Sequence, residues 1–209
     1  MKKAIAQLIR DIKDEDCHIR FAAARTLRDV GAGNPVVQDA LIDALKDSIW
    51  FVRLAALQSL LDIRLESDIT IDKIVPMLKD EHEDVREYAA FAISDMGPNA
   101  SQAVTALTAA LSDSVWHVRA TVAWALGEIG AGARDACSPL ITCLTDNEIE
   151  VRISAARALG TISSTGNKDV ITALKKVFTD ETQPQEVKEK AREALARIRS
   201  SDVQRNFPL

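Results

Sequence analysis

A spacing of 33 residues organises this sequence of 209 residues. An arginine recurs at that interval, and an aspartate stands six residues before each copy of it. The arginines are Arg20, Arg53, Arg86, Arg119 and Arg152, and the aspartates are Asp14, Asp47, Asp80, Asp113 and Asp146. A valine or isoleucine precedes every arginine, and a leucine or isoleucine follows seven residues after it. Five aligned copies indicate a chain built from structural repeats.

Each copy contains two stretches with helical periodicity. After the arginine, apolar or small residues recur at the three- and four-residue spacing that places them on one face of an α-helix. In the fourth copy these residues are Val122, Ala123, Leu126 and Ile129. A second apolar stripe ends just before each aspartate, as in residues 41–45. Each repeat is therefore predicted to contain a helix A, a turn with the aspartate, and a helix B. We expect Asp113 to cap its helix B and Gly130 to end it.

This arrangement predicts an all-α fold. One helix pair cannot bury both apolar stripes, whereas stacked pairs share a continuous core, so we expect one α-α superhelix (solenoid) of about six two-helix repeats in residues 1–200. The expected repeats are approximately 3–31, 34–64, 68–97, 100–130, 133–163 and 167–199. The sixth repeat is degenerate, with two inserted residues and Pro184 before its second helix. The connection at 64–68 is expected to be irregular, and residues 201–209 to form a flexible tail.

Composition narrows the function classes. The formal net charge of −5 argues against a general binder of nucleic acid or anionic membranes, because phosphate binding needs clustered Lys and Arg. The sequence contains no run of 18 apolar residues, so we expect no membrane span. Cys17, Cys137 and Cys143 form no CxxC pair, so we expect neither a disulfide framework nor a zinc site. These features favour a cytoplasmic protein.

The repeat resembles the HEAT repeat, in the short bacterial and archaeal form that also occurs in phycobilisome lyase proteins. The segments VRATVAWALGEIG and VRISAARALGTIS carry the resemblance, together with the D-x5-R spacing, and the resemblance covers roughly residues 3–199. It implies that the turn aspartates and the helix-B arginines form a ladder between neighbouring repeats. It also implies that the B helices line a concave side.

The resemblance does not account for one stripe of helix B. Positions −2, +1, +2, +5 and +9 from the arginine lie opposite the core positions, and position −3 lies at the edge of the stripe near the turn. Seven of the nine aromatic residues of the chain occupy these positions, including every Trp and the only Tyr. Exposed apolar patches of this kind mark partner sites, with Trp and Tyr as common anchors. Trp50 and Trp116 lie beside turns and could instead pack against a neighbouring repeat.

We therefore predict a site for a partner protein or peptide on this stripe. Its residues are Trp50, Phe51, Leu54, Asp62, Tyr88, Phe91, Asp95, Trp116, His117, Thr121, Trp124, Glu128 and Arg157. A row of acids at position +9 favours a partner with basic groups. The row consists of Asp29, Asp62, Asp95 and Glu128. An ordinary solvated charged face, and a homodimer that buries the aromatic residues, are the alternatives.

Catalytic chemistry finds little support in the sequence. No GxSxG, Walker or HExxH motif occurs. HEAT-type deoxyhypusine hydroxylases bind iron through repeated His-Glu pairs, whereas this chain has only His82-Glu83. HEAT-like DNA glycosylases need a basic cleft, whereas the stripe of this chain carries a row of acids, so this activity is not expected. We predict a non-enzymatic binding scaffold with no catalytic residue, metal or cofactor. A bilin lyase-like or other chromophore-handling protein is the alternative that the resemblance suggests.

Overall fold

The computed structural model of the chain describes residues 2–63, 67–164 and 166–206. Within these ranges the chain forms helices and turns and no strand, which confirms the all-α prediction. Its internal contacts divide it into two compact units, Met1–Ala92 and Ile93–Leu209. Each unit is described by itself below.

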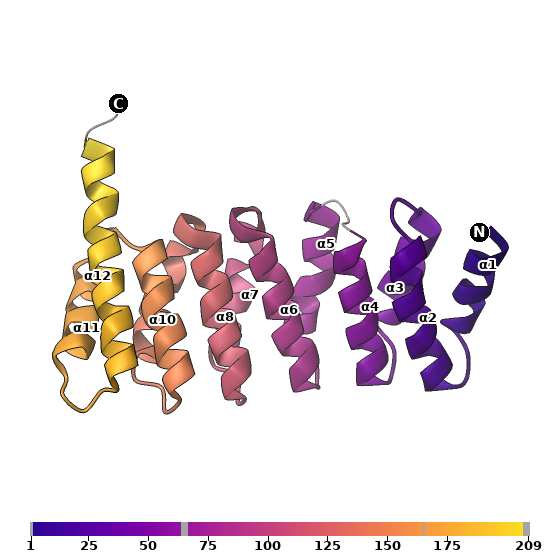
Figure 1. Cartoon of the computed structure of the whole chain (residues 1–209), viewed down its shortest axis with the longest axis horizontal. Helices are drawn as coiled ribbons and strands as arrows, with labels where there is room; N and C mark the ends of the chain where they lie inside the picture. Colours follow the sequence, from indigo (N-terminus) through magenta and orange to yellow (C-terminus); the bar gives the residue numbers. More distant parts are fainter. Residues whose placement is uncertain (1, 64–66, 165, 207–209) are drawn as a thin grey trace. The chain divides into compact units, whose positions relative to one another are not determined.

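The first unit is made of helix pairs. Its first pair is α1 (Lys2–Asp11) with α2 (Cys17–Val30), and its second is α3 (Pro35–Ala44) with α4 (Trp50–Asp62). The helix α5 (Ser67–Ile74) continues as the 3-10 turn η1 (Val75–Lys79), and most of α6 (Glu83–Asp95) completes the unit. In Figure 1 the B helices α2 and α4 lie side by side, with the A helix α3 behind them.

Local sequence explains where these helices begin and end. Asn34 caps α3 by accepting a hydrogen bond from the Val36 N–H, and Pro35 occupies the first position of the helix, where no N–H is needed. Pro76 is the second residue of η1, which follows α5, so the A helix of the third repeat narrows into a 3-10 turn near the proline.

The second unit continues the repeat. It contains η2 (Gly97–Ala103), α7 (Val104–Ala110), α8 (Trp116–Ile129), η3 (Gly130–Ala136), α9 (Cys137–Cys143), α10 (Ile149–Ile162), α11 (Lys168–Thr179) and α12 (Gln185–Asn206). The B helices α8, α10 and α12 form one layer of this unit (Figure 1). Gly130 has φ 69° and ends α8, as the sequence predicts. The helix α12 continues to Asn206, beyond residue 200, where the solenoid was expected to end.

Small residues set the close approach of the B helices in the second unit. A Cβ atom added to Gly160 would lie 2.7 Å from the Ala194 Cα, and one added to Gly127 would lie 3.1 Å from the Ala158 Cα. Thr161 Oγ1 also donates a hydrogen bond across this contact to the Gly127 carbonyl, at 3.0 Å. The helices therefore touch nearly backbone to backbone, which leaves no space for larger side chains between them.

Aliphatic side chains and alanines fill both cores. In the first unit Ala24, Leu27, Leu57 and Leu60 are buried, and the Ser59 hydroxyl bonds the Ala24 carbonyl at 2.9 Å. In the second unit the same positions of the repeat are buried. Burial raises the pKa of the Cys143 thiol to about 11, so this cysteine behaves as a small core residue. Residues 64–66 of the connection predicted to be irregular lie outside the described residues.

Candidate partner-binding surfaces

The turn aspartates Asp47, Asp80 and Asp146 form two kinds of contact, which together fix the start of helix B. Asp80 Oδ1 accepts a hydrogen bond from the His82 N–H at 2.9 Å, two residues further along the turn. Both oxygens of Asp80 also receive hydrogen bonds from Arg53 of the preceding repeat, at 2.6 and 2.7 Å. The third Arg53 nitrogen, Nη1, donates to the Asp47 carbonyl of its own turn at 2.7 Å.

The same geometry recurs along the chain. Arg20 pairs with Asp47 at 2.6 Å in the first unit, and Arg119 pairs with Asp146 at 2.8 Å in the second. The ladder that the resemblance implied is therefore present within both units. The expected capping role of Asp113 is corrected in one respect. Its carboxylate accepts from the Val115 N–H and closes the turn, while Val115 itself is the N-cap of α8.

The ion pairs of the ladder shift the pKa values of its carboxylates. Burial alone would raise the pKa of Asp80, but the hydrogen bonds from Arg53 and His82 and the charge of Arg53 hold that pKa below its usual value. The hydrogen bonds from Arg119 are the main cause of the lowered pKa of Asp146. These carboxylates are charged structural groups, so we assign them no role in proton transfer.

The ladder changes at the degenerate sixth repeat. Arg152 Nη1 still bonds the Asp146 carbonyl at 2.6 Å, but its buried Nε atom has no hydrogen-bond partner in the described part of the chain. The carboxylate of the next turn, Asp180, instead accepts hydrogen bonds from the backbone and hydroxyl of Thr182. The two residues inserted before α12 therefore remove one bidentate pair from the series.

None of the residues predicted to bind a partner is buried. Phe91 and Trp116 are exposed by 43% and 42%, and Asp62, Asp95 and Arg157 are also exposed. The others are half-buried: Trp50, Phe51, Leu54, Tyr88, His117, Thr121, Trp124 and Glu128. All of them therefore reach the surface of their own unit, although their role in binding stays a prediction.

In the first unit the structure joins five rings into what we call the aromatic cluster, which consists of His18, Phe21, Trp50, Phe51 and His82. The Phe51 ring contacts three others: His18 stacked at 5.8 Å, Phe21 edge-on at 5.6 Å and Trp50 edge-on at 5.8 Å between centroids. Trp50 also stacks on His82, at 3.8 Å and an angle of 5°. Trp50 thus packs against the next turn, as the alternative interpretation proposed, and it keeps a half-exposed surface.

Part of the predicted acid row is neutralised within the protein. The Arg28 guanidinium forms two ion pairs: its Nε lies 3.2 Å from Asp29 Oδ1, and its Nη1 lies 3.6 Å from Asp62 Oδ2. In the second unit Arg157 donates to Glu128 at 2.7 Å. Acids at the turns offer a second source of negative charge, because Glu83 and Asp84 begin α6 beside His82. The described structure therefore places acidic groups at this turn as well as in the acid row, and the expected basic partner stays a prediction.

Several surface residues that sequence reasoning missed belong to the last helix. A groove in the second unit is lined by Trp124, Ile153, Arg157, Lys190, Glu193 and Arg197, among others. In the alignment that places Val187 before the arginine position, the last three residues occupy positions +2, +5 and +9. These positions belong to the same stripe of helix B that predicts the partner site in the intact repeats. Applied to the degenerate repeat, the stripe also predicts these three residues.

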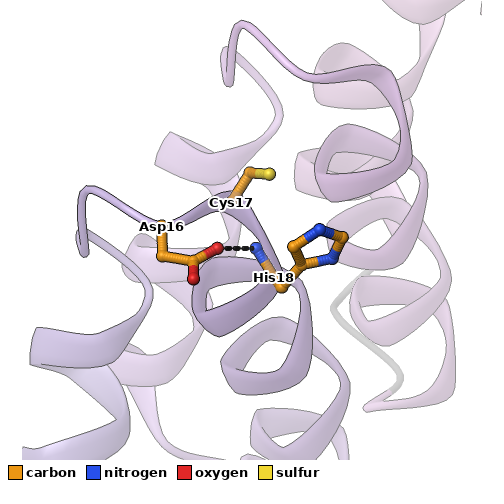
Figure 2. A group of neighbouring side chains, drawn as sticks. All are labelled: Asp16, Cys17 and His18. Carbon is orange, nitrogen blue, oxygen red and sulfur yellow. Dashed lines mark hydrogen bonds between the residues drawn. The ribbon is translucent and has the colours of Figure 1, made fainter.

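Asp16, Cys17 and His18 form a group of potential metal ligands at the start of α2 (Figure 2). Their ligand atoms lie within 4.8 Å of one another. Asp16 is the N-cap of α2 and accepts from the His18 N–H at 2.8 Å, while the His18 ring stacks on Phe51. A cation at this position would meet the positive end of the helix dipole. We therefore assign the group to the helix cap and the aromatic cluster.

The comparison with protein families agrees with the geometry of the repeats. The family model for HEAT repeats matches residues 1–67, 71–147 and 131–196. The chain belongs to the HEAT repeat family. The matched model describes HEAT repeats in general, so the narrower resemblance of this HEAT protein to the phycobilisome-lyase type stays a prediction. A comparison with curated protein sequences gives no match.

Solved structures similar to this HEAT protein are repeat proteins. An engineered protein is 22% identical, with a TM-score of 0.70 over 94% of this chain and 97% of that chain. A computationally designed armadillo repeat protein for modular peptide recognition is 22% identical, with a TM-score of 0.65 over 92% and 99%. Human deoxyhypusine hydroxylase is 21% identical, with a TM-score of 0.52 over 96% and 75%. These likenesses support the expected α-solenoid fold.

Two further observations bear on the other function classes. His82, half of the single His-Glu pair, stacks on Trp50 and belongs to the aromatic cluster. Among the described residues, no helix combines the length and the apolar composition that crossing a lipid bilayer requires.

Proposed function

We propose that this HEAT protein is a non-enzymatic scaffold module that binds a protein or peptide through the aromatic side chains of its B helices. The aromatic cluster of the first unit carries the proposal. Its rings stack on one another at the surface, while aliphatic residues and alanines fill the core beneath them. The core therefore does not account for these rings, whereas partner sites commonly use them as anchors.

The other predicted residues extend the proposal over both units. The ring centroids of Tyr88 and Phe91 in α6 lie 5.7 Å apart, and Phe91 is among the exposed large apolar residues. In the second unit Trp116 is exposed and meets His117 edge-on at 5.6 Å. Thr121 and Trp124 continue this surface along α8. Each unit therefore presents large apolar side chains at its own surface, where a partner segment can contact them.

Charge favours a partner with basic groups in the first unit. Glu83 and Asp84 stand next to the turn that carries His82, and the Asp84 carboxylate lies 3.7 Å from the His82 Nδ1. Lysine or arginine side chains of a peptide would meet both these carboxylates and the faces of the cluster rings. Cation–π contacts of this type contribute about 0.5–2 kcal/mol each.

A selection of peptides tests the proposal. A random peptide library displayed on phage is selected against the full chain, and the enriched peptides are synthesised and titrated by calorimetry. We expect the enriched peptides to contain Lys or Arg next to apolar residues. The double variant Phe21→Ala/Phe51→Ala should weaken their binding by at least about tenfold, because both anchors of the cluster are removed.

A matched aromatic control separates binding from stability. Phe178→Ala removes a ring that is more exposed than Phe21 or Phe51 from the A helix α11, and it should leave binding unchanged. Helical circular dichroism and the urea midpoint are measured for every variant. The proposal fails if no peptide is enriched, or if the double variant binds normally. A large loss of stability in the double variant would assign both rings to the core. A concentration-dependent dimer that the same two substitutions dissolve would replace the partner with a second copy.

A further inference from the structure

The groove in the second unit has a different chemical character from the aromatic cluster. It has a volume of about 660 Å³ and lies on three consecutive B helices. Trp124 comes from α8, Ile153 and Arg157 come from α10, and Lys190 and Arg197 come from α12. Apolar and cationic side chains thus share one surface recess.

The packing of the helices shapes this recess. Gly160 of α10 and Ala194 of α12 both line it, at a point where the two backbones approach closely. Because neither residue has a side chain larger than a methyl group, the groove is open above this contact, while longer side chains rise on either side. The Thr161 hydrogen bond to Gly127 joins α10 to α8 beside it. The recess is therefore built on tightly joined helices, which favours a defined site.

Positive charge predominates along the groove. Arg157, Lys190 and Arg197 line it, against the single lining carboxylate of Glu193. Within the described residues, the Arg197 guanidinium has neither an ion pair nor a side-chain hydrogen bond. The pKa of Glu193 is lowered mainly by a hydrogen bond from Lys190, and to a lesser degree by the charges of Lys190, Arg192 and Arg197. The surroundings of this carboxylate are therefore electrically positive.

The other two cations can exchange partners at small cost. Arg157 bonds Glu128 at 2.7 Å, with side-chain exposures of 51% and 37%. Lys190 bonds Glu193 at 2.9 Å, with exposures of 37% and 59%. Exposed pairs of this kind contribute little to stability and are open to competition from other anions. A ligand carboxylate can therefore bind Arg197 directly and compete for Lys190.

We propose that this groove binds an extended peptide segment in which a glutamate or aspartate stands next to an aromatic or aliphatic residue. The carboxylate pairs with Arg197 and Lys190, and the neighbouring apolar side chain packs against Trp124 and Ile153. A single carboxylate fits better than a polyphosphate or nucleic acid, because Glu128 and Glu193 stay beside the cations and repel a dense anion. The assignment rests on the proposed peptide-binding function and adds an acidic specificity in the second unit.

Indole NMR signals test the site directly. The probes are acetyl-Ala-Phe-Glu-Glu-Phe-Ala-amide and the same peptide with both glutamates replaced by glutamine. Each is titrated into the full ¹⁵N-labelled chain, whose indole signals are assigned from single Trp→Phe variants. We expect the glutamate peptide to shift the signal of Trp124, and the glutamine peptide to bind at least about tenfold more weakly, since charge-assisted hydrogen bonds are lost.

Charge reversal supplies the second arm. Arg197→Glu should weaken the glutamate peptide by at least about tenfold, because an attraction becomes a repulsion. Arg199→Glu is the matched control, since it makes the same change two residues further along α12 and Arg199 does not line this groove. Both positions are exposed, and circular dichroism checks their fold.

Each outcome separates this inference from the broader function. Equal binding of the two peptides, an unaffected Arg197→Glu variant, or the absence of any Trp124 shift overturns the acidic site. The proposed function survives those results if the phage-selected peptides still depend on Phe21 and Phe51. If those peptides bind independently of the cluster while the glutamate peptide shifts Trp124, the acidic site stands and the aromatic surface fails.

Discussion

Single aspartates join consecutive repeats of this protein. Asp80 closes its own turn through the His82 N–H and receives two hydrogen bonds from Arg53 of the repeat before it. The Arg53 and Asp80 side chains are only 7% and 5% exposed. A buried charge without its partner costs far more than the intact pair contributes. One residue type at one position of the repeat therefore controls both the turn and the register between helix pairs.

Asp80→Asn should lower the free energy of unfolding by up to about 3–5 kcal/mol, because the buried Arg53 would lose its bidentate partner. Only the exposed Glu81 carboxylate, 3.1 Å from the Arg53 Nη2, would remain as a counter-charge. The asparagine oxygen can still close the turn, so the loss measures the ion pair. Asp62→Asn is the control, since its pair with Arg28 is 3.6 Å long and largely exposed, and it should change stability by less than about 1 kcal/mol. Urea unfolding at neutral pH measures both variants, and similar losses would contradict the prediction.

The same pair predicts how stability depends on pH. The pKa of Asp80 is lower in the folded chain than the value of about 3.9 in an unfolded chain, so the unfolded state binds the proton more tightly. The stabilisation is fully present above that unfolded value and is lost as the pH falls through the folded pKa. In Asp80→Asn the acid limb of the stability curve should therefore be shallower than in the parent chain. Equal slopes below about pH 4 would show that this carboxylate contributes nothing there.

At the scale of the helices, the 33-residue period predicts the helix pairs better than it predicts the segments that connect them. The helix pairs, the burial of Leu27, Leu60 and Leu126, and the ladder follow from the 33-residue pattern and the resemblance. The 3-10 starts of two A helices, η2 and η3, were not predicted. The segment GPNASQA holds Gly, Pro and Asn, and GAGARDA holds two Gly, and these residues weaken an α-helix without specifying what replaces it.

The candidate site was predictable in part for the same reason. The stripe positions are counted from the arginine of each repeat. They therefore predicted Trp124 and Arg157 in intact repeats but missed Lys190 and Arg197 in the degenerate repeat, which lacks that arginine. His82 was not among the stripe positions because this ring lies in the turn, outside helix B, and only the stacking on Trp50 brings it into the cluster. Pairing among charges is likewise set by side-chain conformation, which explains why neutralisation of Asp62 and Glu128 was not expected.

Gly160→Ala should separate α10 from α12. The added Cβ would lie 2.7 Å from the Ala194 Cα and 2.8 Å from its Cβ, and neither the backbone nor a methyl group can rotate away. We expect a loss of about 1–3 kcal/mol, as for other overpacked cores. Gly127→Ala, whose nearest contact is 3.1 Å, should cost less. The comparison uses urea midpoints, and a gain in stability for Gly160→Ala, from its better helix propensity, would refute the steric argument.

At the scale of the whole molecule, composition conceals what the surfaces do. The net charge of −5 describes the chain as a whole. Lys190 and Arg197 nevertheless give the second unit a cationic groove, while Glu83 and Asp84 leave a turn of the first unit acidic. Averages over a repeat protein lose this information because each repeat contributes its own surface residues to a shared scaffold. Function in such a chain is therefore carried by departures from the repeat.

The repeat architecture also predicts how the molecule opens. Each repeat contacts mainly its neighbours, and the internal contacts of this chain fall into two units, so a local defect should stay local. In hydrogen exchange with mass spectrometry, Asp80→Asn should raise exchange in α4 and in the turn before α6, which its ion pair joins. Peptides from α10 and α12 should exchange as in the parent chain, because their mutual packing through Gly160 is untouched. A uniform rise over all helices would instead show that the whole chain unfolds in a single cooperative step.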